Sequence, residues 1–453
     1  MKNNMSTIIY ARIKGYIPSL IKKPILKILQ LYRKIRLAKR KKYVANHIDV
    51  MHSELRSLYS AQSPVSVVFI ASSIASWKVD SVVSAMMDSP YFEVSCVVAR
   101  LVNGSGANVA SHEREKLLNH FCLKGYRYID TYGMNEDEIR KLLGDLSPHV
   151  VFLTNPHALV KPVLHEEIYM NYLTCYVPYH HEVVSYGDNK EQYDQLSHNA
   201  FWKIYSPHQT SKDIYRATRR RGDNGVEVTG LPACESLYNQ SSKAKWHWKA
   251  PSGKKLRVIW APHWLIRPDL KLATIYELGN VIREIAEKYR DRVEWVMRPH
   301  PFLRPTLEQH PEWGKEKTDA FFQFWSDSPF TQIEEGDYVD LFRTSDAMIH
   351  DSGSFLAEYL CVDKPVMYLK TENTSDNYLN FFGQKALAAC EIGRNKDEIE
   401  NFILSLLDDP KPDDHKRKAF IRDFLDPLYG NAPSTKICSD LLRELNVVTP
   451  PGD

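Results

Sequence analysis

Short apolar runs alternate with stretches of helical periodicity along much of the chain. Residues 65–71 (VSVVFIA) are rich in β-branched side chains and almost continuously apolar, as a strand buried in a parallel sheet should be. Strands that alternate with helices of about 10–15 residues are typical of a parallel α/β sheet. Residues 61–240 are therefore predicted to form a Rossmann-like domain, with further strands at residues 93–99, 128–129, 149–153, 173–177 and 226–229 and helices at residues 77–87, 109–123 and 135–143.

A polar stretch at residues 241–255 interrupts this alternation and is predicted to be a linker, because it contains Pro251-Ser252-Gly253 and no clear periodicity. A second α/β series follows it. Residues 241–430 are predicted to form a second Rossmann-like domain that faces the first across a cleft, and residues 431–453 a C-terminal helix and tail. The strands of this series are expected at residues 256–260, 293–297, 347–349 and 365–369, and its helices at residues 270–289, 395–407, 416–429 and 434–445.

The first 60 residues have a different pattern, in which apolar side chains are mixed with many cations. Spacings of three and four predict one apolar face on a helix, and no run reaches the ~20 apolar residues that a membrane span needs. We expect residues 1–45 to lie on an anionic membrane surface, where each cation contributes about 1 kcal/mol. Docking on the protein's own surface and binding of nucleic acid or another partner are the alternatives. The apolar face comprises Ile21, Ile25, Ile28, Leu29, Tyr32 and Ile35.

The formal net charge of +3 conceals an asymmetry between this arm and the rest of the chain. Residues 1–50 contain 13 Lys or Arg and one acid, Asp49, which leaves 46 basic and 55 acidic side chains for the remainder. A nucleic-acid-binding protein would more often spread its cations over the folded domain, so no nucleic-acid partner is expected. The seven cysteines form no Cys-x-x-Cys pair, which argues against a zinc site and a disulfide framework. A cytoplasmic protein, peripheral on the cytoplasmic face of the membrane and without metal or cofactor, is predicted.

Three motifs follow predicted strands of the second domain. Ala261-Pro262-His263-Trp264 follows the strand at residues 256–260, Arg298-Pro299-His300-Pro301 follows residues 293–297, and Asp351-Ser352-Gly353-Ser354 follows residues 347–349. If these strands are parallel neighbours, the three loops meet at one edge of the sheet, where open α/β sheets bind their ligands.

The residue types in these loops are suited to a nucleotide-activated donor. Gly353 lets the backbone approach a phosphate, and Ser352 and Ser354 offer hydroxyl donors before a predicted helix N-terminus. Arg298 and His300 are expected to supply cationic donors to the departing phosphate, and Glu358 to accept hydrogen bonds from ribose hydroxyls. Each piece has a simpler explanation as a cap, a rigid strand exit or a surface side chain, and only their combination indicates a site.

These residues resemble the CDP-glycerol glycerophosphotransferase family, the teichoic-acid and capsule polymerases, whose fold is GT-B. The resemblance covers residues 256–370: members carry Arg-x-His-[Pro/Tyr], then Asp-[Tyr/Ser]-Ser-Ser followed by an acid. Gly353 replaces the first of the paired serines and Glu358 replaces an aspartate, so the segment is equally similar to that of sugar-nucleotide epimerases and other GT-B enzymes. The donor-binding residues implied by the resemblance are His263, Arg298, His300, Asp351, Ser352, Gly353, Ser354 and Glu358.

The resemblance also implies a histidine base in the first domain, beside a catalytic His300. His180 or His181, after the strand at residues 173–177, matches that place, whereas His198 has the pattern of a helix end packed on the core. Histidine suits this role because its ordinary pKa lies near neutral pH.

The predicted function is transfer of glycerol phosphate from CDP-glycerol to a lipid-linked glycan acceptor in the synthesis of a cell-surface polymer. A GT-B glycosyltransferase that uses a CMP- or UDP-sugar for capsule or lipopolysaccharide is the first alternative. A non-catalytic scaffold recruited to the membrane is the second.

Overall fold

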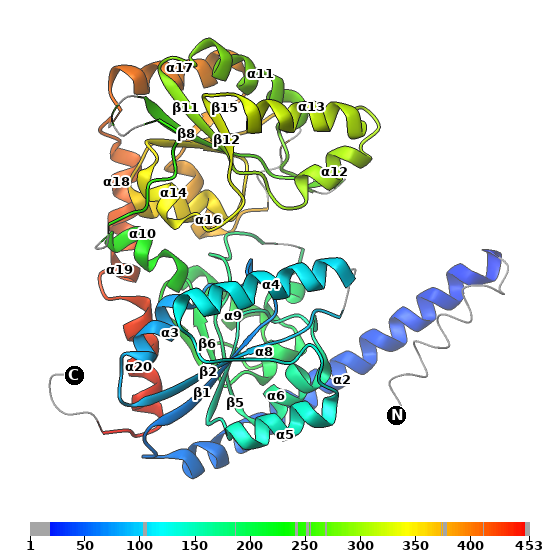
Figure 1. The fold of residues 1–453 in the computed structure, drawn as a ribbon. Helices are drawn as coiled ribbons and strands as arrows, with labels where there is room; N and C mark the ends of the chain where they lie inside the picture. Colours follow the sequence, from blue (N-terminus) through cyan, green and yellow to red (C-terminus); the bar gives the residue numbers. More distant parts are fainter. Residues whose placement is uncertain are drawn as a thin grey trace.

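The computed structural model describes residues 19–448, apart from residues 103–106, 186, 241–242, 251–252, 254, 268–269, 373, 375–377 and 411. Two α/β domains are stacked on each other, and the long helix α2 (Ser19–Tyr59) extends beside the N-terminal domain (Figure 1). Both sheets are entirely parallel with helices on both faces, which confirms the predicted doubly wound α/β class.

The N-terminal sheet has seven strands in the order β3-β2-β1-β4-β5-β6-β7. Side chains of β1 alternate between two hydrophobic clusters, with Val67 and Phe69 in one and Val68 and Ile70 in the other. Burial on both faces explains why the strand has no polar alternation. The strands are β1 (Val65–Ala71), β2 (Phe92–Val98), β3 (Tyr128–Asp130), β4 (Val150–Leu153), β5 (Leu173–Tyr176), β6 (Lys203–Ser206) and β7 (Val226–Val228).

The helices of this domain confirm the three predicted ones and add shorter segments that the sequence pattern missed. The capping box of Asn135 and Glu138 fixes the start of α5. The helical segments are α3 (Asp80–Met87), α4 (Ala107–Lys124), α5 (Glu136–Leu146), η1 (Pro162–Leu164), α6 (Glu166–Asn171), α7 (Lys190–Tyr193), α8 (Leu196–Ala200), α9 (Gln209–Thr218), η2 (Pro232–Cys234) and α10 (Glu235–Asn239).

The C-terminal sheet has six strands in the order β12-β11-β8-β13-β14-β15. The chain therefore starts in the middle at β8, builds outward to β12, and returns to the other side of β8 with β13. The strand order reverses between β8 and β13, which is where such sheets bind ligands. The strands are β8 (Leu256–Ala261), β11 (Val293–Met297), β12 (Thr331–Ile333), β13 (Ala347–His350), β14 (Val366–Leu369) and β15 (Glu391–Gly393).

The predicted helix at residues 270–289 begins later than expected, because a small hairpin of β9 (Ile266–Arg267) and β10 (Leu270–Lys271) precedes it. The predicted helix at residues 416–429 is divided by a π-helical turn, η4 (Ile421–Leu425). The helical segments of this part are α11 (Ile275–Lys288), α12 (Leu303–Gln309), α13 (Gly314–Asp327), α14 (Val339–Thr344), α15 (Phe355–Glu358), η3 (Tyr359–Val362), α16 (Phe381–Ala388), α17 (Lys396–Asp408), α18 (His415–Phe420), α19 (Asp426–Tyr429) and α20 (Pro433–Glu444).

The two domains are joined at several places besides the linker. The loop after β5 pairs with the C-terminal domain, where Val184 and Leu379 form an antiparallel bridge. Helices α18, α19 and α20 run down one side of the molecule, and α20 returns to the N-terminal domain (Figure 1), where Ile437 and Leu441 are buried in the same cluster as β1. These contacts hold the carboxyl ends of the two sheets toward each other.

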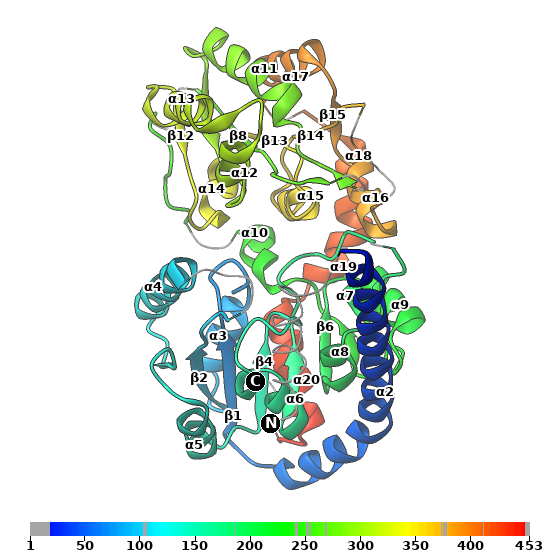
Figure 2. The ribbon, with the colours of Figure 1, turned by 90° about the vertical axis from the view of Figure 1, so that its right-hand side faces the viewer.

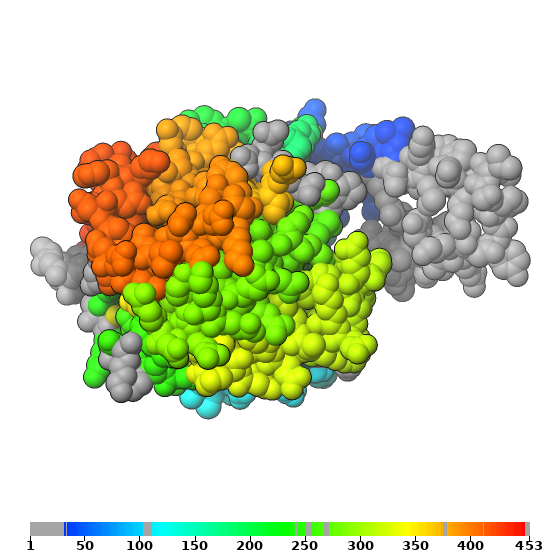
Figure 3. Space-filling model, turned by 90° about the horizontal axis from the view of Figure 1, so that it is seen from above, coloured from blue at the N-terminus to red at the C-terminus, as the bar shows by residue number. Residues whose placement is uncertain are grey.

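Helix α2 has a docked part and a projecting part. Val44, Ile48 and His52 are buried against the N-terminal domain. Tyr32 and Ile35, from the predicted apolar face, are 63% and 48% exposed, so at these positions that face does not dock on the protein's own surface. In the view from above, the blue part of α2 is visible beside the C-terminal domain (Figure 3). The other members of the predicted face lie outside the described side chains.

Among the described residues, no helix is both long enough and apolar enough to cross a membrane.

Candidate functional site

The three strand-end motifs of the C-terminal domain meet at the point where the strand order reverses. Strands β11, β8 and β13 are neighbours in the parallel sheet, so their carboxyl ends lie side by side. Figure 2 shows β8 and β13 next to each other. The His300 amide donates to the Pro262 carbonyl at 3.1 Å, and the rings of His263 and His300 lie 4.9 Å apart. The convergence expected from the sequence is therefore present.

Asp351 holds this edge together rather than facing outward. Its fully buried carboxylate accepts from the His263 amide at 2.5 Å and from the amide and hydroxyl of Thr274 at 2.7 and 2.8 Å. Burial raises the pKa of Asp351 to about 7, although these three donors oppose the shift. The carboxylate thus fixes the loop after β8 and the start of α11, and positions His263 beside His300.

His263 and His300 share a local geometry that fixes their tautomer. The Nδ1 of His263 accepts the Leu265 amide at 3.1 Å, and that of His300 accepts the Phe302 amide at 3.1 Å. Burial, together with His300 nearby, lowers the pKa of His263 to about 3, and burial lowers the pKa of His300 to about 4. Both rings are therefore neutral at pH 7 with the hydrogen on Nε2. The expected cationic donor at His300 is instead a neutral N–H donor.

Arg298 supplies the charge that His300 does not. Its Nη2 donates to the Gly336 carbonyl at 2.6 Å, whereas its buried Nη1 has no partner among the described residues. The guanidinium lies 5.1 Å from the ring centre of Tyr338. A buried guanidinium nitrogen without a partner is costly, so this group is available to an anionic ligand.

Glu358 is also buried, and the hydroxyl of Tyr338 donates to its carboxylate. Burial raises the pKa of Glu358, and the nearby cations Lys78 and Arg298 oppose that shift. One oxygen of the carboxylate predicted to bind ribose is therefore already occupied.

Lys78 is a residue of this site that the sequence reasoning missed. It belongs to the loop after β1 in the N-terminal domain, yet its ammonium donates to the Tyr338 hydroxyl at 3.2 Å and lies 4.5 Å above that ring. No motif surrounds Lys78, and its place beside Arg298 and Glu358 depends on how the domains meet. Two cations from different domains thus flank one acid.

The loop Ser352–Ser354 carries the hydroxyls predicted to bind phosphate. Neither serine hydroxyl makes a hydrogen bond to another described residue, and Ser354 is exposed. Helix α15 has only four residues and continues as a 3₁₀ turn, so its dipole is weaker than the sequence suggested. A Cβ on Gly353 would lie 3.8 Å from Val184, which is ordinary contact distance, and the loop after β5 therefore touches this one.

That loop carries the two predicted base candidates, and they differ sharply. His181 is fully buried, with its Nε2 2.9 Å from the Tyr429 hydroxyl and its ring stacked on Phe382. His180 is half-buried, and its Nδ1 accepts the Glu182 amide at 2.9 Å. Burial lowers the pKa of His180 to about 4. Of the two histidines, only His180 is partly exposed.

His198 is fully buried in α8 against Tyr176 and Phe201, as expected for a core histidine. The ligand atoms of His181, Cys234 and Cys361 lie within 4.8 Å of one another and form the group of described residues best suited to hold a metal. Burial raises the pKa of the Cys234 thiol well above its ordinary value, so without a bound metal this side chain is a neutral thiol.

Comparison with solved structures supports the GT-B arrangement. The chain is similar to a putative UDP-N-acetylglucosamine 2-epimerase from Listeria monocytogenes, with a TM-score of 0.59 and 18% identity over 86% of this chain and 99% of that one. It is also similar to a variant of the wall teichoic acid polymerase TagF, with a TM-score of 0.58 and 14% identity over 91% of this chain and 98% of that one. No curated protein sequence matches the chain.

A sequence profile decides between these two resemblances. The profile of the CDP-glycerol:poly(glycerophosphate) glycerophosphotransferase family matches residues 177–441, which is more than half of the chain. The match begins at the loop that carries His180 and includes all three strand-end motifs. The protein therefore belongs to the CDP-glycerol:poly(glycerophosphate) glycerophosphotransferase family and is a transferase with two Rossmann-like domains in the GT-B arrangement.

Proposed function

We propose that this protein transfers glycerol phosphate from CDP-glycerol to a hydroxyl of a lipid-linked glycan, in the synthesis of a cell-surface polymer at the cytoplasmic face of the membrane. The observation that carries the proposal is the meeting of Arg298, His263 and His300 at the strand-order reversal, in a chain whose family profile names this donor. The unpartnered Nη1 of Arg298 supports an anionic donor there.

The reaction requires a new bond from the acceptor oxygen to the glycerol-bearing phosphorus. The bond between that phosphorus and the bridging oxygen breaks, and CMP leaves with the electron pair. Arg298 and Lys78 neutralise the charge that develops on the leaving phosphate, while His263 and His300 donate Nε2–H to its oxygens. The hydroxyls of Ser352 and Ser354 hold the diphosphate, and Asp351 keeps the His263 loop in place.

His180 is the proposed base. Its lowered pKa leaves the imidazole neutral and able to accept a proton, and a bound diphosphate would raise that pKa toward neutrality. The Glu182 amide currently occupies Nδ1, so the hydrogen resides on Nε2. Base catalysis at Nε2 therefore requires that the hydrogen bond from the Glu182 amide to Nδ1 breaks, so that the ring hydrogen can move to Nδ1.

The donor is tested by incubating the purified protein with glycerol-labelled CDP-glycerol and, separately, with CMP- and UDP-sugars. Release of CMP together with transfer of labelled glycerol phosphate is expected only from CDP-glycerol. Transfer from a sugar nucleotide alone would instead establish the glycosyltransferase. A protein that no CDP- or UDP-compound protects from thermal unfolding would be the non-catalytic scaffold.

A further inference from the structure

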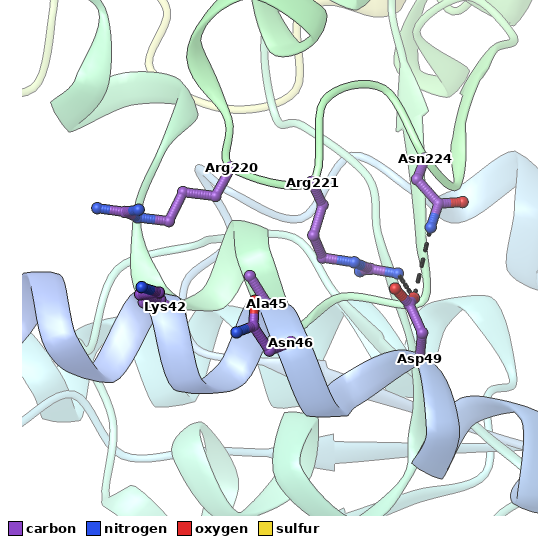
Figure 4. A pocket seen from close by; sticks show the side chains of 7 residues that line it. All are labelled: Lys42, Ala45, Asn46, Asp49, Arg220, Arg221 and Asn224. Atoms are coloured by element: carbon purple, nitrogen blue, oxygen red, sulfur yellow. Dashed lines mark hydrogen bonds and ion pairs between the residues drawn. The ribbon is translucent and has the colours of Figure 1, made fainter.

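A cavity of about 410 Å³ lies between α2 and the turn that joins α9 to β7 (Figure 4). It shares no residue with the strand-end loops of the donor site. Helix α2 forms one wall and the turn forms the other. The lining residues are Lys42, Ala45, Asn46, Asp49, Arg220, Arg221 and Asn224.

The cavity is strongly cationic. Lys42 and Arg220 have no ion-pair partner among the described residues, and in Figure 4 their side chains lie one above the other at one end of the cavity. Arg221 is paired with Asp49, the only carboxylate of the lining, yet its buried Nε has no hydrogen-bond partner. The lining thus contains three cations and one acid.

Arg219 strengthens the case because it is only 4% exposed, and both its Nε and its Nη1 lack partners among the described residues. Burial and the neighbouring Arg221 lower its pKa to about 9. Buried cations normally have a counter-ion, because unpaired burial costs several kcal/mol. Asp49 and Asp194 offset part of that cost for Arg219, and an anion at the adjacent Arg220 would add to the offset.

The position of the cavity on α2 indicates where such an anion comes from. Leu31 and Ile35 precede Lys42 by eleven and seven residues, so the three side chains share one face of the helix. Leu31 and Ile35 are 59% and 48% exposed. About 10 Å of helix separates Ile35 from Lys42. A membrane that buries the side chains of Leu31 and Ile35 would therefore also place its lipid phosphates near the cavity.

We propose that this cavity binds the phosphate of an anionic glycerophospholipid headgroup, with Lys42 and Arg220 donating to its non-bridging oxygens. The inference rests on the proposed membrane role of α2 and adds a defined lipid contact to general charge attraction. Charge-assisted bonds of this kind depend on the positions of the two cations and not only on their number.

A pair of double variants with the same loss of charge tests this dependence. Lys42→Gln with Arg220→Gln removes the cavity cations, and Lys34→Gln with Lys39→Gln removes two exposed cations of α2 outside the cavity. The measurement is sedimentation of the full chain with phosphatidylglycerol–phosphatidylcholine vesicles. The cavity variant should lose about tenfold more affinity than the matched one. Equal losses of vesicle affinity in the two double variants would show that the cavity does not bind lipid phosphate, but would not contradict the membrane role of α2.

Two further measurements separate the source of the phosphate. Asp49→Asn removes the only carboxylate of the lining and should tighten vesicle binding about fivefold. Calorimetry with inorganic phosphate should detect no comparable binding. If only the cavity variant loses phosphate binding, and the two double variants bind vesicles equally well, the ligand of the cavity is a free anion and not a lipid. If the wild-type protein does not bind the vesicles, both the proposed lipid site in the cavity and the membrane role of α2 are wrong.

Discussion

The ammonium of Lys78 crosses from the N-terminal domain to donate to the hydroxyl of Tyr338, 3.2 Å away in the C-terminal domain. Tyr338 in turn donates to Glu358 and lies beneath Arg298. One tyrosine therefore links an acid and two cations where the two domains meet. Because the cations come from opposite domains, the proposed donor site contains both of them only where the two domains meet.

We expect Lys78→Gln to lower turnover of CDP-glycerol about 10–100-fold, because it removes a cation aimed at the developing charge. Steady-state kinetics with labelled donor measures the effect. Lys141→Gln, on the exposed face of α5, is the matched control and should change turnover less than twofold. If Lys78→Gln and Lys141→Gln behave alike, Lys78 takes no part in turnover.

His300 and His310 form a second matched pair, because the Nδ1 of each accepts the amide two residues later, at 3.1 and 3.2 Å. Only His300 lies beside His263. His300→Ala should lower kcat/KM at least about tenfold, since it removes a donor to the phosphate, whereas His310→Ala should have little effect. His300→Gln, which retains an N–H donor, should recover part of the loss. Comparable losses for the two alanine variants would remove His300 from the site.

The sequence predicts most strands because buried parallel strands are short apolar runs, as β1 and β8 show. Strand β6 escapes this pattern because it begins with Lys203, a buried lysine that needs Asp440 and Glu444 from distant α20 as partners. The three-residue edge strands β12 and β15 have too few apolar positions to stand out.

The candidate donor site likewise combines features that the local sequence predicts with features that depend on tertiary contacts. The three motifs are recognisable because each follows a strand, and parallel strands end at one edge. Spacing cannot separate the adjacent His180 and His181, because burial of His181 depends on Phe382 and Tyr429, about two hundred residues away or more. The neutrality of His300 likewise follows from burial and from the Phe302 amide. Lys78 has no local signal.

Glu182 predicts a pH dependence of stability. Its carboxylate is buried near Tyr215 and Tyr193, its Oε2 has no partner among the described residues, and burial raises its pKa from 4.5 to about 7. The folded state binds the proton of Glu182 more tightly than the unfolded state does. The contribution of this group to the free energy of unfolding is therefore complete below pH 4.5 and is lost as the pH rises through 7. The midpoint temperature of thermal unfolding should therefore decrease as the pH is raised from 5 to 8.

Glu182→Gln should flatten this pH dependence, because a neutral amide replaces the titrating group. At pH 8 the variant should be the more stable protein, by up to about 3 kcal/mol, and at pH 5 the two should be close. Thermal unfolding at both pH values measures the difference, with the exposed Glu54→Gln as control. A variant that is less stable than wild type at pH 8 would show that the ionised carboxylate has partners in solution.

The docked part of α2 determines where the arm can be removed without damage to the fold. Lys41 pairs with Asp194 at 3.1 Å, and Val44 is 2% exposed, so a cut beyond residue 40 would disturb the N-terminal domain. Deletion of residues 1–37 retains these contacts but removes Leu31, Ile35 and most of the cations. The truncated protein should bind anionic vesicles at least about a hundredfold more weakly, at about 1 kcal/mol for each lost cation near the surface, and retain its affinity for CDP-glycerol. Vesicle sedimentation and calorimetry measure the two quantities. Full vesicle binding after truncation would assign the membrane contact to the folded domains, and loss of donor affinity would show that the arm supports the donor site.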